Sequence, residues 1–198
     1  SRPRWRPYLM GIVNATPDSF SDAPGHKSLD ERVELARRLI ADGADIIDVG
    51  GESGVTNKPA VEVAEEIARV VPVIEAIAAL QGAVVSVDTY KPAVARAAIA
   101  AGARIVNDVS GLADDELAAA ASEGDAAIVL MHTRAKPKQK HFPHYEDVVA
   151  DVRSFLSDAI ARATAQGVPL ERVIVDPGPD FAKTPAQTIA TLRELDQL

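Results

Sequence analysis

Residues 83–111 read AVVSVDTYKPAVARAAIAAGARIVNDVSG and contain the repeating unit from which the fold is inferred. Two short β-branched runs, Val84–Val87 and Arg104–Val106, flank an alanine-rich segment whose composition favours a helix. Gly102 stands between that segment and the second run, where a left-handed residue ends a helix at little steric cost. Strand, helix and strand in this order predict a parallel βαβ unit.

The same unit occurs six times along the chain. The segments between the predicted strands are amphipathic, as in 148–160, where apolar residues recur at helical spacing. The same helix-ending turn is expected at five glycines: Gly43, Gly82, Gly102, Gly124 and Gly167. The predicted strands are Tyr8–Val13, Asp45–Val49, Val84–Val87, Arg104–Val106, Ala127–Met131 and Arg172–Val175.

Polar residues at the ends of these strands distinguish between two parallel architectures. Parallel strands buried on both faces form an open doubly wound sheet or a closed barrel. The first strand runs into GIVNATPDSF, which lacks the glycine-rich turn of a dinucleotide-binding sheet. A barrel instead places its site at the carboxyl ends of many strands. Polar residues end all six: Asn14, Asp48, Asp88, Asn107 with Asp108, His132 and Asp176. We therefore predict a single (β/α)8 TIM-barrel domain over 1–198, with about six of eight units present.

Composition limits the possible partners. The 198 residues are 47% hydrophobic and 25% charged, which is typical of a soluble domain, and no run has the length of a membrane span. A net charge of −8 disfavours nucleic-acid binding, so the basic segment 134–140 is interpreted as a solvated loop. His141 and His144 are interpreted as surface residues. The absence of cysteine excludes thiolate metal sites and fits a cytoplasmic protein with no membrane partner.

Three of the polar strand ends suit a small planar ligand. Asp88, Asn107 and Asp176 would present carboxylate and amide groups at the bottom of a mostly apolar pocket. A buried carboxylate accepts two donors, and an amide both donates and accepts, so a heterocycle with ring N–H and amino groups fits them. No serine lies beside a histidine motif, so no nucleophile is expected.

Six ordered motifs resemble those of the dihydropteroate synthase family from about residue 8 onward. They are GIVNATPDSFSD (11–22), GADIIDVGGES (43–53), SVDTYK (86–91), NDVSG (107–111), VLMH (129–132) and DPGPDFAKT (176–184). The resemblance implies a cytoplasmic transferase of folate biosynthesis and a sulfonamide target. Its reaction is the condensation of 6-hydroxymethyl-7,8-dihydropterin diphosphate with p-aminobenzoate, with Mg²⁺ as cofactor. The family also implies a possible homodimer.

The same resemblance implies roles for individual residues. The pterin pocket would contain Asp88, Asn107, Met131, Asp176 and Phe181. Asn14 would bind diphosphate and its magnesium ion. A loop that closes over the site would include Thr16, Asp18, Ser19 and Phe20, and the p-aminobenzoate loop would include Phe20, Ser53 and Lys58.

The chain departs from the family pattern after GGES. Gly54 and Val55 stand where the family has Thr and Arg, so a guanidinium of the p-aminobenzoate loop is missing. Lys58 is expected to supply a point charge in its place. This change favours, as an alternative, a non-catalytic pterin-binding paralogue, and less strongly a methyltetrahydrofolate methyltransferase.

Length is the second departure. Two more units would bring the chain near the usual barrel size of about 250 residues, so the C-terminal part is expected to be missing. The family's Ser-Arg-Lys and Arg-x-His motifs are not found. An open barrel of six strands would expose two parallel strand edges. A chain of this length alone is therefore expected to fold poorly and not to catalyse.

Overall fold

The computed structural model describes residues 6–16, 28–54 and 59–197, and these form alternating strands and helices. The strands are β1 (Met10–Asn14), β2 (Ile46–Gly50), β3 (Val84–Asp88), β4 (Ile105–Asp108), β5 (Ala127–Met131) and β6 (Val173–Asp176). The helices are α1 (Leu29–Ala41), α2 (Val63–Ala78), α3 (Pro92–Ala100), α4 (Glu116–Glu123), α5 (Val148–Ala165) and α6 (Pro185–Arg193). Short 3₁₀ turns occur at Leu170–Arg172 and Leu195–Gln197.

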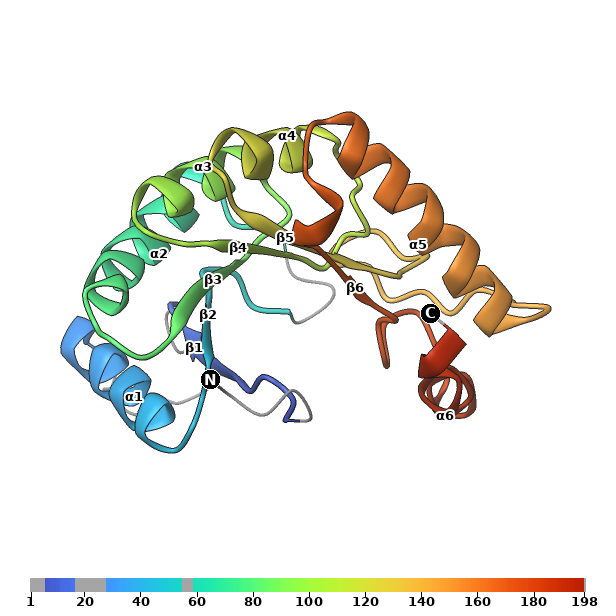
Figure 1. The fold of residues 1–198 in the computed structure, drawn as a ribbon, viewed down its shortest axis with the longest axis horizontal. Coiled ribbons are helices and arrows are strands. Elements are labelled where there is room, and N and C mark those ends of the chain that lie inside the picture. Colours follow the sequence, from blue (N-terminus) through green and yellow to red (C-terminus); the bar gives the residue numbers. More distant parts are fainter. Residues whose placement is uncertain (1–5, 17–27, 55–58, 198) are drawn as a thin grey trace.

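The strands form one parallel sheet in the order β1-β2-β3-β4-β5-β6. Figure 1 shows the strands as a curved layer, with α1 to α5 along its outer side. Sequential parallel strands with helices on one side are successive units of a (β/α)8 barrel, so the predicted fold class is confirmed. In such a barrel the carboxyl ends of all strands open on the same side.

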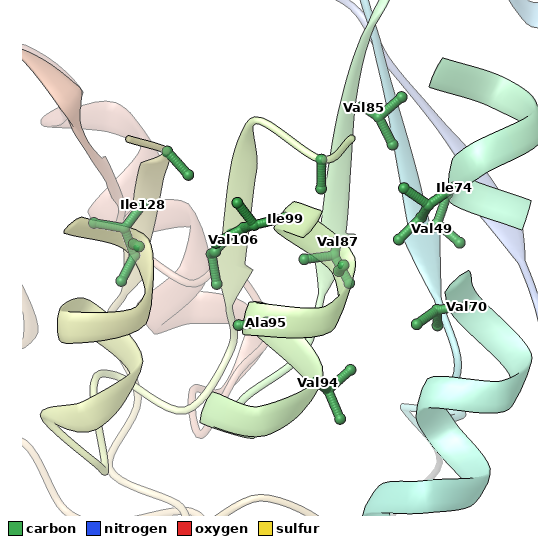
Figure 2. Packing of buried hydrophobic residues seen from close by; sticks show 14 of the residues in the cluster. Val49, Val70, Ile74, Val85, Val87, Val94, Ala95, Ile99, Val106 and Ile128 are labelled. Atoms are coloured by element: carbon green, nitrogen blue, oxygen red, sulfur yellow. The ribbon is translucent and has the colours of Figure 1, made fainter. Parts of the chain in front are cut away.

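The main hydrophobic core lies between the sheet and the outer helices. Val49, Val87, Val106 and Ile128 stand in register on four neighbouring strands, and all are fully buried. Figure 2 shows these side chains with residues of α2 and α3, among them Ile74, in the same layer. Because side chains alternate along a strand, the neighbouring residues face the inside of the curve.

Helix starts agree with local sequence signals. Ser28 and Glu31 form a capping box at α1, and Thr184 and Gln187 form another at α6. Asp147 caps α5 by accepting from two backbone N–H groups. The β6–α6 loop, residues 177–184, therefore ends at a well-defined helix start.

Two local predictions were wrong. The strands β1, β2, β3, β4 and β6 each extend one or two residues beyond the predicted range. Asn14, Asp88 and Asp176 are the last residues of their strands, as expected for polar residues that end them. Parallel pairing with a neighbour holds these polar residues in the sheet. At Gly124 the turn differs, because its φ is −92° and Asp125 instead adopts the left-handed conformation, with φ 56°. A side chain at Gly124 would collide with Ile99, so close packing explains this glycine.

Candidate active site

Four of the predicted pocket residues form two pairs at the carboxyl ends of the strands. Asp88 is opposite Asn107 in the β3–β4 pairing, and Met131 is opposite Asp176 in the β5–β6 pairing. Asn107 is also in register with Val129, two residues before Met131. Residues two apart share a face of a strand, so both pairs face the inside of the curve.

Asn107 is oriented by a carboxylate that the sequence interpretation placed incorrectly. Asp48 was expected to close the second strand, but it lies inside β2 and is 5% exposed. The Asn107 amide donates to Asp48 Oδ2 at 3.0 Å, which leaves the Asn107 carbonyl oxygen to accept from a ligand. Within the described part of the chain, Asp48 Oδ1 is buried and has no hydrogen-bond partner. Burial raises the pKa of Asp48.

Asp88 has the most strongly altered acidity among the predicted pocket residues. Burial raises its pKa to about 7, and the negative charges of Asp48, Glu66, Asp108 and Glu52 add to this rise. Near neutral pH the free protein is therefore a mixture of molecules in which Asp88 is protonated and molecules in which it is ionised. A bound ligand that donates N–H groups would favour the carboxylate form.

Lys91, a largely buried cation, joins the β2–α2 loop to the segment that follows Asp88. Lys91 Nζ contacts Glu52 Oε2 at 2.7 Å, Glu66 Oε2 at 2.5 Å and the Val61 carbonyl oxygen at 2.7 Å. The Thr89 hydroxyl donates to Glu66 at 2.8 Å. These contacts link the β2–α2 loop, where the p-aminobenzoate loop is expected, to the segment that follows Asp88.

A cavity of about 410 Å³ opens above this network. Asp88, Ser53 and Phe181 line it, and they come from three different βα units. Three other predicted pocket residues, Asn107, Met131 and Asp176, are not among its lining residues. More of the lining surface is apolar than polar, although charged residues such as Glu66 and Lys136 also contribute to it.

The basic segment 134–140 contributes to this cavity, contrary to its interpretation as a solvated loop. Lys138 is only 13% exposed at its side chain, lies 3.4 Å from Glu52 Oε1 and donates to the Ser53 carbonyl oxygen. Lys136, Lys140 and His141 also line the cavity, although all three are exposed. His144 is exposed, as predicted. The β5–α5 loop is thus joined to the β2–α2 loop over the site.

Comparison with known proteins identifies the family. Residues 10–198 match the family described as pterin binding enzyme. The chain belongs to this family. The dihydropteroate synthase of Synechocystis sp. is 40% identical over 195 residues, which cover 98% of this chain and 68% of that enzyme.

Solved structures agree with this pterin-binding enzyme in fold and sequence. A dihydropteroate synthase of Xanthomonas albilineans, solved with 4-aminobenzoic acid, has a TM-score of 0.88 and 44% identity, and covers 98% of this chain and 69% of its own. A Yersinia pestis dihydropteroate synthase, solved in a sulfonamide drug complex, has a TM-score of 0.89 and 39% identity. It covers 97% of this chain and 70% of its own.

The predicted diphosphate side of this pterin-binding enzyme is described only at its start. Asn14 ends β1 with an exposed side chain. Arg32 donates to the carbonyl oxygens of Asn14 and Thr16, at 3.1 Å and 3.2 Å, and so holds the chain as it leaves the strand. The other residues of the predicted loops lie outside the described residues: Asp18, Ser19, Phe20 and Lys58. Their roles remain predictions.

One buried pair of this pterin-binding enzyme was missed by sequence reasoning. Lys183 and His132 are both fully buried, and Lys183 Nζ lies 2.7 Å from His132 Nδ1. Both belong to motifs that carry the family resemblance, VLMH and DPGPDFAKT. The predicted pocket residues of these motifs were Met131, Asp176 and Phe181. A lysine between Ala182 and a helix start gives no local signal of burial, because the partners come from a distant strand end.

Proposed function

We infer that this protein is a dihydropteroate synthase, a transferase of folate biosynthesis. It condenses 6-hydroxymethyl-7,8-dihydropterin diphosphate with p-aminobenzoate and releases 7,8-dihydropteroate and diphosphate. The observation that carries this inference is the in-register pair of Asp88 and Asn107 at the barrel mouth. It occurs in a chain 40% identical to a dihydropteroate synthase and similar in structure to another solved with 4-aminobenzoic acid.

Pterin recognition follows from the hydrogen-bonding capacity of this pair. A pterin ring carries N–H and amino donors next to a carbonyl group. The Asp88 carboxylate accepts from two such donors, and the Asn107 carbonyl oxygen, left free by the bond from its amide to Asp48, accepts another. Asp176 accepts from the Gly178 N–H at 2.7 Å through Oδ1, so its other oxygen is directed to a ligand by a fixed carboxyl group. Met131 and Phe181 supply apolar contact to the ring.

The reaction itself requires little covalent chemistry from the protein. The amine nitrogen of p-aminobenzoate forms a bond to the pterin methylene carbon, the bond from that carbon to the diphosphate oxygen breaks, and the amine loses a proton. Holding the two substrates in line and excluding water supplies most of what such a displacement needs. The loops around the cavity that contains Ser53 and Phe181 are suited to this role.

We propose that magnesium binds together with the diphosphate at Asn14. Among the residues that the structure describes, no group of three His, Cys, Asp or Glu residues could hold a metal ion. The Asn14 side chain is an exposed oxygen donor, which fits an ion that keeps several waters and binds mainly to phosphate oxygens. Such an ion would stabilise the charge on the departing diphosphate. Asn14→Ala should raise the magnesium concentration needed for half-maximal diphosphate-pterin binding.

Three expectations, on location, assembly and inhibition, accompany this function. No helix within the described ranges is long and apolar enough to cross a membrane. The cytoplasmic location and the homodimer implied by the family remain predictions. We also expect sulfonamides to compete with p-aminobenzoate, since the Yersinia pestis relative is solved in a sulfonamide drug complex.

A non-catalytic pterin-binding protein is the second candidate, favoured by Val55 at the position where the family has arginine. Titration calorimetry separates the two. The purified protein is titrated with the pterin diphosphate and then, with pterin bound, with p-aminobenzoate, and dihydropteroate is measured by chromatography. Binding of both ligands and product formation support the synthase. Pterin binding without p-aminobenzoate binding would identify the paralogue, and absence of pterin binding would refute both.

A further inference from the structure

Among the residues that the structure describes, Lys183 has the largest fully buried side chain, and it has no role in the reaction described above. Its amino group lies 2.7 Å from His132 Nδ1, 2.9 Å from the Gly178 carbonyl oxygen, 3.2 Å from the Phe181 carbonyl oxygen and 3.3 Å from the His132 carbonyl oxygen. A lysine amino group is rarely fully buried unless polar partners surround it. Here three of the four partners are backbone oxygens of the β5 end and the β6–α6 loop.

His132 connects this amino group to the outer helix α5. Its Nε2 lies 2.8 Å from Asp151 Oδ2, and Arg134 contacts both oxygens of the same carboxylate. Burial lowers the pKa of His132 to about 4, although Asp151 opposes the change. The imidazole is therefore neutral near pH 7, with its Nε2 proton donated to Asp151 and its Nδ1 free to accept from Lys183.

The β6–α6 loop adopts a backbone conformation that needs such support. Gly178, Asp180 and Ala182 have φ values of 64°, 69° and 54°. For the two non-glycine residues this left-handed region is strained. The Lys183 amino group holds the carbonyl oxygens of residues 178 and 181, which flank Asp180, and the Tyr145 hydroxyl donates to the Ala182 carbonyl oxygen at 3.1 Å.

This loop directly follows Asp176, the last residue of β6, and presents Phe181 to the cavity. We propose that Lys183 is a positioning residue for the pterin. Through its contacts with His132 and the loop carbonyl oxygens, it holds the β6–α6 loop in the conformation that places Asp176 and Phe181 at the ligand. The proposal rests on the function inferred above.

Loss of a proton from Lys183 should loosen the loop. Burial lowers the pKa of Lys183 to about 8, while Asp176 and Asp151 favour the charged form. Arg134 lies beyond Asp151, the Tyr145 hydroxyl contacts the loop, and Asp180 belongs to the loop itself. The neutral amine has two protons for four acceptors, so contacts with the loop are lost as the pH rises. Pterin affinity should fall as pH rises through about 8, in addition to any titration of the ligand itself.

Pterin binding by calorimetry between pH 6.5 and 9.5 tests this proposal, and ratios of variant to wild-type affinity remove the titration of the ligand. Lys183→Met should bind about tenfold more weakly near pH 7, as expected for loss of a charged hydrogen-bond donor, and should lack the alkaline decrease. Arg153→Met removes an exposed cation from α5 and should behave as wild type. Asp151→Asn should move the alkaline decrease to lower pH, because the carboxylate no longer favours the ammonium form.

The variants distinguish this proposal from a purely structural role. Wild-type affinity and pH dependence in Lys183→Met would overturn it. If Lys183→Met does not fold, Asp151→Asn decides, since an unshifted alkaline decrease would equally overturn it. Wild-type protein that binds no pterin at any pH would instead overturn the proposed function, and this proposal with it. If the wild-type protein binds pterin and the variants show the same affinity and pH dependence, only the positioning role is refuted.

Discussion

Replacing Asp88 with asparagine should remove pterin binding and, above neutral pH, increase stability. The folded protein raises the pKa of this carboxyl group from 3.8 to about 7, mainly through burial. The folded state thus holds the proton more tightly than the unfolded state. The contribution of the protonated Asp88 carboxyl group to stability is fully present below the pKa of the unfolded state. It is lost as the pH rises through the pKa of the folded state. Asparagine has nearly the same shape and carries no charge, so it avoids this loss.

The pKa difference sets the size of the effect. The rise of the Asp88 pKa from 3.8 to about 7 corresponds to about 4 kcal/mol, and about 2.5 kcal/mol of that develops between pH 5 and pH 8. Because Asp88 is only partly buried by accessible surface, solvent screening reduces the expected change to about 2 kcal/mol. Urea unfolding followed by circular dichroism, at pH 5 to 8, gives the difference between Asp88→Asn and wild type.

The matched control is Asp158→Asn, the same substitution at an exposed position of α5. Its stability difference from wild type should not change over this pH range. A difference for Asp88→Asn that is equally independent of pH would refute the inferred environment of Asp88. Calorimetry on the same samples should detect no pterin binding, because asparagine replaces a charged acceptor of two donors with one neutral acceptor.

Three further substitutions test the surroundings of the site. Lys91→Met should destabilise the protein by about 3 kcal/mol in urea, since Glu52 and the buried Glu66 both lose a cationic partner. Arg96→Met, which breaks exposed ion pairs, should cost less than about 1 kcal/mol, and equal effects would contradict the network. Lys138→Met should weaken p-aminobenzoate binding several-fold and leave pterin binding intact, because it frees the loop after β2 from the β5–α5 loop; an unchanged titration argues against that link. Gly178→Ala should abolish pterin binding, since its new carbon would lie 2.1 Å from a backbone oxygen, while Gly54→Ala has open space and should bind normally.

Much of the fold was predictable because its signals are local. β-branched runs, alanine-rich amphipathic segments and glycine turns repeat along the chain, and each reports a short-range preference of the backbone. Ala127–Met131 was predicted at its observed bounds. The polar residues that end the strands were also visible, although parallel pairing keeps Asn14, Asp88 and Asp176 inside the strands, which short-range propensity does not indicate.

The sequence by itself determined the order of parallel units, the edge of the sheet where the site lies and the family to which the chain belongs. Only the tertiary structure decided which side chains meet there. Lys138 reaches Ser53 across 85 residues, and Lys183 reaches His132 across 51. The raised pKa of Asp88 and the lowered pKa of Lys183 have the same origin, since burial and neighbouring charge are set by packing between distant segments. A local pattern specifies where a chain turns, but the electrostatic environment of a group depends on everything folded around it.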